Sequence, residues 1–319
     1  MPESPNRSET ALCRPPVGEF VSVGDRRLLV HRRGSERPAI VFLPGAGTIG
    51  IDYWAAFEGA SALSTSILYD RAGTGWSDDA PLPRTADQVT DELLALLSAL
   101  DALDGESGGA SSVMLVGHSL GGGYAQHFAR RFPERVCALL LLDPAHQDYP
   151  AYEPPAIAAA AAAAESASAA GDGPAEWVPP VEVLQAFAAL FAEKFAAYPP
   201  SIRDAAIEYH TKRWRTGLLE SSNAHALYAQ LAKAPPLPDV PLVVLTARAL
   251  DAGARFFMPD ALQQEVIDGK ARLNAFIASS VPRGSERVLP DASHSFMAAE
   301  RADAVVAALR ELLAQVTRA

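Results

Sequence analysis

Short apolar runs alternate with helical patterns along much of the chain. Residues 39–43, 136–142 and 241–246 are almost continuously apolar, which is typical of strands buried on both faces of a sheet. Between the first two runs, residues 85–103 carry apolar side chains at helical spacing, and Thr85 can cap the start of that helix. This alternation predicts an α/β fold with a mostly parallel central sheet and helices on both faces.

Further segments extend the pattern toward both ends. The turn signal Gly24-Asp25 separates two short apolar stretches, 20–23 and 27–32, and predicts a hairpin. The other predicted strands are 66–69, 113–116 and 287–289, and the other predicted helices are 124–131, 259–279 and 302–314.

The strand-and-helix alternation stops between about 145 and 235. An Ala run at 156–164 predicts a helix, with a low-complexity loop as the alternative. Residues 180–198 carry a strong apolar stripe, and 201–215 and 222–233 are further helix candidates. A helical insertion between two strands indicates a cap. The predicted organisation is therefore a flexible tail (1–16), the first part of the core (17–146), a helical cap (147–236) and the second part of the core (237–319), with a Gly/Ser-rich linker at 104–112.

Composition narrows the range of partners. A net charge of −11 and a pI near 5.1 argue against nucleic acid or an anionic membrane surface as the main partner. The polar N-terminus lacks the apolar region of a secretory signal, and no apolar run reaches the length that crosses a bilayer. Cys13 and Cys137 are the two cysteines, too few for a disulfide framework. We expect a cytoplasmic protein, and make no prediction of its oligomeric state.

The stretch VMLVGHSLGGG at 113–123 carries the first candidate for catalysis. An apolar strand stops at Gly117, Ser119 stands between Gly117 and Gly121, and a helical pattern follows. A nucleophilic serine on a strand-to-helix turn needs this setting, because larger neighbours would crowd its strained backbone. A Gly-rich turn that serves packing alone would look similar, so the rest of the chain must supply a base, an acid and an oxyanion hole.

Candidates for these three parts occur in suitable places. His294 follows the last predicted strand and is the expected base. Asp251, after the strand at 241–246, is the preferred acid, and Asp143, after the strand at 136–142, is the alternative. Asp143 could instead cap the turn into Pro144.

Backbone N–H groups would form the oxyanion hole. Leu120 directly follows the serine, and Ala46 lies in the turn Pro44-Gly45-Ala46-Gly47 after an apolar strand. An ordinary tight turn would use the same glycines. No spacing typical of metal ligands occurs, and we predict neither a metal nor a cofactor.

Six segments, taken in order, resemble the α/β-hydrolase superfamily, and more closely its capped, esterase- and epoxide-hydrolase-like branch with a serine nucleophile. They are LPGAG (43–47), YDRAGTGWSD (69–78), GHSLGGG (117–123), LLLDPAH (140–146), PLVVLTARALD (241–251) and DASHSFMAAERADAVVAAL (291–309). The resemblance implies the α/β-hydrolase fold, Ser119 as nucleophile, His294 as base, an acid after a late strand, and the Ala46 and Leu120 amides as oxyanion donors. It also implies a structural role for Asp70 and Arg71 in the pocket wall.

Two departures from the family's pattern matter. Pro44-Gly45 stands where the family often has His-Gly, which leaves the backbone amides in place. Ser119 stands where epoxide hydrolases and haloalkane dehalogenases have Asp, so neither of those activities is expected.

These features predict a cofactor-free serine hydrolase that forms an acyl-enzyme. A small apolar ester, thioester or lactone is the expected substrate, because the cap offers apolar side chains such as Phe187, Leu190, Phe191 and Trp214. One alternative keeps the serine but transfers the acyl group elsewhere, as an acyltransferase, cyclase or perhydrolase. Another is a non-catalytic ligand-binding protein with the same fold.

Overall fold

The computed structural model describes residues 12–104, 111–169 and 179–317. Most of the predicted tail and of the predicted Gly/Ser-rich linker lies outside these ranges. Residues 170–178 of the predicted helical cap lie outside them as well.

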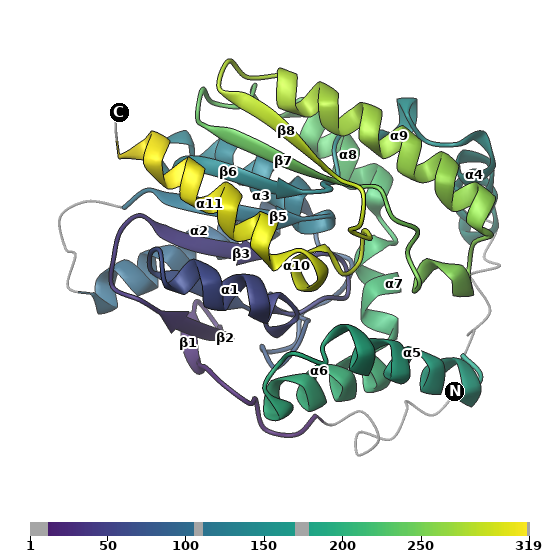
Figure 1. Ribbon diagram of the computed structural model, residues 1–319, viewed down its shortest axis with the longest axis horizontal. Coiled ribbons are helices and arrows are strands. Elements are labelled where there is room, and N and C mark those ends of the chain that lie inside the picture. Colours follow the sequence, from purple (N-terminus) through teal and green to yellow (C-terminus); the bar gives the residue numbers. More distant parts are fainter. Residues whose placement is uncertain (1–11, 105–110, 170–178, 318–319) are drawn as a thin grey trace.

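An eight-stranded sheet in the order β1-β2-β4-β3-β5-β6-β7-β8 forms the centre of the described structure (Figure 1). Its strands are β1 (Glu19–Val23), β2 (Arg26–Arg33), β3 (Ala39–Leu43), β4 (Ser66–Tyr69), β5 (Val113–His118), β6 (Val136–Leu142), β7 (Leu242–Ala247) and β8 (Gly284–Leu289). Strands β1 and β2 pair antiparallel, β2 pairs antiparallel with β4, and all other pairs are parallel. The carboxyl ends of β3, β5, β6, β7 and β8 therefore meet at one edge, where ligand sites of such sheets lie.

Helices cover both faces of this sheet. They are α1 (Trp54–Ser61), α2 (Ala86–Leu103), α3 (Leu120–Arg131), α9 (Asp260–Ser279), α10 (Met297–Glu300) and α11 (Ala302–Val316). Helices α1 and α11, which lie in front of the sheet in Figure 1, contribute to one apolar cluster, and α2, α3 and α9 contribute to the other. Strands β3, β5 and β7 have every residue buried, because their side chains alternate between the two clusters.

Five helices lie between β6 and β7 in the chain. They are α4 (Pro155–Ala169), α5 (Val181–Lys194), α6 (Pro200–Lys212), α7 (Arg215–Ser221) and α8 (Ala224–Lys233). The Ala run forms part of α4, as the favoured prediction had it. In Figure 1, α5 and α6 lie side by side at the sheet's lower right. Helix α7 follows α6 in the chain and leads back toward the core. These five helices form an insertion between two neighbouring strands of the sheet.

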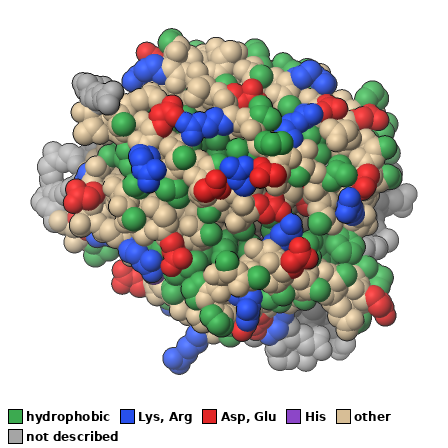
Figure 2. All heavy atoms as spheres, viewed as in Figure 1, with side chains coloured by type: hydrophobic (Ala, Val, Ile, Leu, Met, Phe, Trp, Pro, Cys, Tyr) green, Lys and Arg blue, Asp and Glu red, His purple; other side chains and the backbone are tan. Residues whose placement is uncertain are grey.

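The sequence predicts the sheet better than the short helices. Strands β3, β4 and β6 have the predicted bounds, and the Thr85 side chain accepts from the Gln88 N–H at the start of α2. Helix α3 begins at Leu120 rather than at residue 124, and α1 and α7 were not predicted as separate helices. No helix in the described ranges is long and apolar enough to cross a membrane. On the face seen in Figure 2, basic side chains are interspersed with acidic ones.

Candidate active site

Ser119 lies on the sharp turn between β5 and α3. Its backbone has φ 49° and ψ −119°, a region that residues with a side chain rarely adopt. The turn is held by its own backbone: the Ser119 N–H donates to the Leu142 carbonyl at 3.0 Å, and the Ser119 carbonyl accepts from the N–H groups of Gly122 and Ala145. Because Ser119 directly follows β5, its hydroxyl stands at the carboxyl edge of the sheet.

The glycines around Ser119 are required by close contacts. A Cβ on Gly121 would lie 2.1 Å from the Leu43 carbonyl oxygen, and one on Gly117 would lie 2.7 Å from the Gly122 Cα. Both contacts are with backbone, which cannot move aside cheaply. The serine turn thus packs directly on the chain that leaves β3.

Ser119, His294 and Asp143 form a continuous hydrogen-bonded chain. His294 Nε2 lies 3.0 Å from Ser119 Oγ, and His294 Nδ1 lies 2.5 Å from Asp143 Oδ2. Because an ionised carboxylate only accepts hydrogen bonds, Nδ1 carries the proton and Nε2 is left to accept from the serine hydroxyl. This is the arrangement in which a histidine can remove a serine proton.

The Asp143 carboxylate is buried but well compensated. Burial alone would raise its pKa, yet the Lys270 ammonium and the hydrogen bonds from His294 and Asn274 outweigh burial and hold the pKa of Asp143 well below its usual value. Asn274 donates to Asp143 Oδ1 at 2.7 Å, and Lys270 Nζ lies 3.5 Å from Oδ2. Asp143 is therefore ionised at neutral pH. Sequence reasoning missed both supporting residues, since they lie on α9, far from the motifs.

The structure contradicts the preference for Asp251 as the acid that contacts His294. Its Oδ2 instead accepts the Ser295 N–H at 2.7 Å, and its Oδ1 accepts the Gly253 N–H at 2.8 Å. Both aspartates follow strands at the same edge of the sheet, but β6 lies next to the serine strand and β7 one place further away. Asp251 thus anchors the loop that carries the histidine, and the alternative candidate, Asp143, contacts the ring.

The backbone N–H groups of Ala46 and Leu120 have no acceptor among the described residues, and the Gly121 N–H has none either. Their neighbours in the β3 turn are occupied: the Gly45 N–H donates to the Tyr53 hydroxyl at 2.9 Å, and the Gly47 N–H donates to Glu220 at 2.7 Å. Both N–H groups that the sequence predicts as oxyanion donors therefore remain available to an additional oxygen, and their role as an oxyanion hole stays a prediction.

His118 connects the loop that carries His294 to Tyr53, which contacts the turn after β3. It is buried, and burial lowers the pKa of its ring to about 3, so the ring is neutral. One nitrogen then donates to the His294 carbonyl at 2.9 Å, and the other accepts from the Tyr53 hydroxyl at 2.7 Å. His118 thus has a hydrogen-bonding role beside the serine, and its partner Tyr53 lies in no motif of the sequence.

A cavity of about 390 Å³ lies between the helical insertion and the core. On the core side the cavity is lined by Ala46, His118 and Ser295. His118 directly precedes Ser119 in the chain, and Ser295 directly follows His294. The insertion contributes mainly apolar side chains, among them Leu184, Phe187, Phe191, Phe195, Trp214 and Leu218. Of the apolar residues named from the sequence, Leu190 packs against the core and does not line the cavity.

Within the described residues, no group of three His, Cys, Asp or Glu side chains could hold a metal ion. The hydrogen-bonded chain of Ser119, His294 and Asp143 can support transfer of an acyl group through the serine oxygen.

Comparison with known proteins places the chain in a family. Residues 40–308 match the model of the alpha/beta hydrolase family, which is most of the chain. The chain therefore belongs to the alpha/beta hydrolase family, and the predicted fold class is confirmed.

Individual relatives are more distant. A (lyso)-N-acylphosphatidylethanolamine lipase of Mus musculus is 33% identical over 110 residues, which are 34% of this chain and 31% of that protein. The match thus spans about a third of either chain. An esterase from Thermogutta terrifontis covers 93% of this chain and 98% of its own, at 20% identity and a TM-score of 0.58. The enol-lactonase from Burkholderia xenovorans LB400 covers 93% and 100%, at 22% identity and a TM-score of 0.58. These structures share the fold.

Proposed function

We propose that the protein is a serine hydrolase that cleaves a carboxylic ester, thioester or lactone through an acyl-enzyme on Ser119. The observation that carries the proposal is the pair of contacts made by one imidazole, 3.0 Å to Ser119 Oγ on one side and 2.5 Å to the Asp143 carboxylate on the other. The relatives named above include a lipase, an esterase and an enol-lactonase.

The first half of the reaction forms the acyl-enzyme. His294 Nε2 removes the hydroxyl proton while Ser119 Oγ bonds to the substrate carbonyl carbon, whose oxygen becomes an alkoxide. The N–H groups of Ala46 and Leu120 donate to that alkoxide. The intermediate then collapses, the bond from carbon to the leaving oxygen or sulfur breaks, and the proton on His294 passes to the leaving group. Asp143 stabilises the imidazolium throughout.

The second half regenerates the serine. Water enters the vacated position, gives a proton to His294 and bonds to the acyl carbon. The same two N–H groups hold the second alkoxide. Collapse breaks the bond between carbon and Ser119 Oγ, which takes its proton back from His294, and the acid product leaves.

The cavity supports an apolar acyl group as substrate. Its insertion side presents Phe187, Phe191 and Trp214, and such a surface favours burial of an acyl chain by about 25 cal/mol per Å² of apolar area. The helical insertion acts as a cap in this proposal, because it closes the space above Ala46 and His118.

Ser119→Ala tests the proposal. Wild-type protein should hydrolyse p-nitrophenyl butyrate and be labelled covalently by a fluorophosphonate, and Ser119→Ala should lose both. Ser111→Ala, a substitution outside the site, is the control and should keep both. Labelling or turnover that survives in Ser119→Ala would refute the mechanism, and a wild type that binds esters without turnover would favour the non-catalytic alternative.

A further inference from the structure

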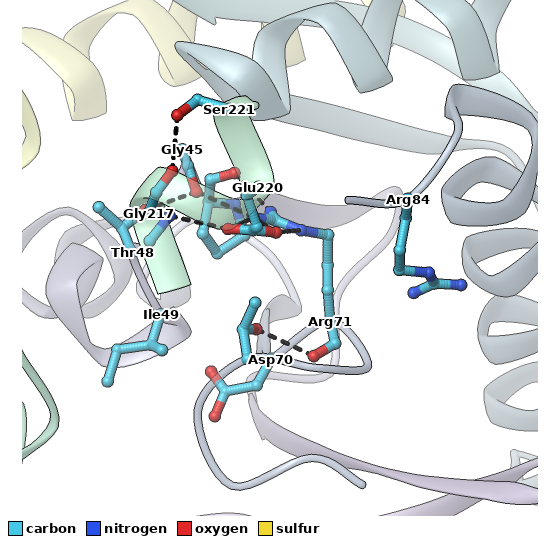
Figure 3. Close-up of polar contacts among 12 residues, drawn as sticks. Gly45, Thr48, Ile49, Asp70, Arg71, Arg84, Gly217, Glu220 and Ser221 are labelled. Carbon is cyan, nitrogen blue, oxygen red and sulfur yellow. Dashed lines mark hydrogen bonds and ion pairs between the residues drawn. The ribbon is translucent and has the colours of Figure 1, made fainter. Parts of the chain in front are cut away.

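Helix α7 of the insertion packs on the turn that carries the proposed oxyanion donor Ala46. A Cβ on Gly47 would lie 2.6 Å from the Gly217 Cα, so the two backbones touch with no side chain between them. Gly47 has φ 68°, which further restricts the position to glycine. Figure 3 shows Gly217 and Glu220 on α7 beside Gly45 and Thr48 of this turn.

Glu220 reaches from α7 into this turn and is 4% exposed. Its Oε2 accepts the Gly47 N–H at 2.7 Å. Its two oxygens also accept from the Arg71 guanidinium, with Nη2 at 2.8 Å from Oε1 and 3.0 Å from Oε2, and Nε at 3.1 Å from Oε1. The carboxylate therefore connects the insertion both to the turn and to a buried arginine.

Arg71 contacts the same turn from its other end. It is 1% exposed, and it donates from Nη1 to the Pro44 carbonyl at 2.5 Å and from Nη2 to the Gly45 carbonyl at 2.9 Å. The family resemblance implies only a structural role for Arg71 in the pocket wall, and nothing in the sequence pairs it with Glu220, 149 positions away.

These contacts fix both peptide planes beside Ala46. The Gly45 carbonyl and the Ala46 N–H belong to one planar trans peptide and point in opposite directions. A donor bound to that carbonyl therefore determines where the Ala46 N–H points. The next peptide joins the Ala46 carbonyl to the Gly47 N–H, and Glu220 holds it. A rotation of either plane would break a bond to the ion pair.

We propose that Glu220, together with Arg71, is a positioning pair that orients the Ala46 N–H toward the alkoxide, so that the helical insertion completes the oxyanion hole. This inference rests on the serine hydrolase function proposed above. Neither side chain needs to touch the substrate, because both act through the backbone of the turn.

Glu220→Gln keeps the shape of the side chain but removes its charge and one acceptor. We expect kcat for p-nitrophenyl butyrate to fall about 10- to 100-fold, somewhat less than the loss of an entire oxyanion donor, with KM within about twofold of wild type. The Ki of a trifluoromethyl ketone, which forms an alkoxide on Ser119, should rise by about the same factor as kcat falls. Glu208→Gln, an insertion carboxylate paired with Lys212, is the matched control and should change neither.

A second variant covers the case in which Glu220→Gln does not fold. Arg71→Met with Glu220→Met replaces the buried pair by apolar side chains of similar length, a change that often preserves folding. It should lower kcat at least as much as the single variant, with KM little changed. Circular dichroism and thermal unfolding confirm that each variant tested is folded.

Full kcat and an unchanged ketone Ki in either folded variant would overturn the positioning role, and so would an effect on KM alone. Ser119→Ala is measured alongside to separate the two proposals. If it is inactive while a folded Glu220 variant keeps full kcat, the positioning role alone fails. If Ser119→Ala is fully active, both the function and the positioning role fail.

Discussion

Asp143→Asn removes the charge behind His294 while leaving the volume of the side chain unchanged. Asn274 Nδ2 donates to Asp143 Oδ1 at 2.7 Å, so in the variant the amide oxygen faces Asn274 and the amide NH₂ faces His294. The ring nitrogen that meets this NH₂ must then be unprotonated. His294 is left with its proton on Nε2, where it cannot accept the proton of Ser119.

The expected loss of activity has two parts. Two unit charges about 4 Å apart attract by about 4 kcal/mol at an effective dielectric constant of 20, so an imidazolium without its carboxylate reacts about 10³-fold more slowly. The wrong tautomer raises the total loss to about 10⁴-fold, the size known for this substitution in other serine triads. If the side-chain amides of Asn274 and of the substituted residue 143 both rotate by about 180°, the correct His294 tautomer is restored. Only the loss of the charge then remains.

The assay compares Asp143→Asn with Asp251→Asn, using kcat/KM for an activated ester at pH 7 and above. Asp251 accepts the Ser295 and Gly253 N–H groups, so its substitution should loosen the histidine loop and reduce activity about tenfold. The two variants thus separate an electrostatic role from an anchoring role at the same edge of the sheet.

The reverse order would refute this reasoning. If Asp251→Asn lost about 10⁴-fold and Asp143→Asn about tenfold, the acid would be Asp251, as we preferred from the sequence. Equal and small losses would show that neither carboxylate supports the imidazole. Both variants must keep a wild-type unfolding transition for the comparison to hold.

Three further predictions concern stability and specificity. Burial lowers the pKa of His118 to about 3, so below pH 6.5 the unfolded chain binds a proton that the folded chain does not. The free energy of unfolding therefore decreases as the pH is lowered from 7 to 5. Urea unfolding at pH 7 and pH 5 should show a loss about 2 kcal/mol larger in wild type than in His118→Gln; an equal loss would contradict the buried neutral ring. Gly121→Ala should lower the free energy of unfolding by about 1–3 kcal/mol, since its Cβ would lie 2.1 Å from the Leu43 carbonyl oxygen. Gly123→Ala, whose Cβ would meet nothing closer than 3.4 Å, should leave the urea midpoint unchanged or raise it, and similar effects of both would refute the packing argument. Phe191→Ala should enlarge the 390 Å³ cavity and shift kcat/KM across p-nitrophenyl esters toward longer acyl chains, and an unchanged profile would place the acyl group elsewhere.

The parts of the structure that local chemistry determines could be read from the sequence. A strand buried on both faces is a continuous apolar run, which is why β3, β4 and β6 have their predicted bounds. Ser119 and its glycines are identifiable because crowding at one turn leaves few choices of residue. Helix α1 was missed because its eight residues contain a glycine and no side-chain cap. Glu220 was missed because its partners come from two distant segments.

The choice of acid required the order of the strands, which local patterns do not contain. Asp143 and Asp251 both follow a buried apolar strand, and both side chains end at the same edge of the sheet. Asp143 has φ 44°, a left-handed backbone that turns its carboxylate toward His294, and a sequence gives no direct sign of such a turn.

The two aspartates that competed in the sequence have complementary places in the structure. Asp143 holds the ring of His294 through Nδ1, and Asp251 holds the backbone of the next residue, Ser295, through its N–H. The His294 carbonyl is fixed as well, by the ring of His118. In the proposed mechanism, the His294 ring must stay within hydrogen-bonding distance of Ser119 while it gains and loses a proton, which needs both its charge and its loop constrained. Anchoring alone would leave the imidazolium uncompensated, and a carboxylate alone would leave the loop free to move the ring away.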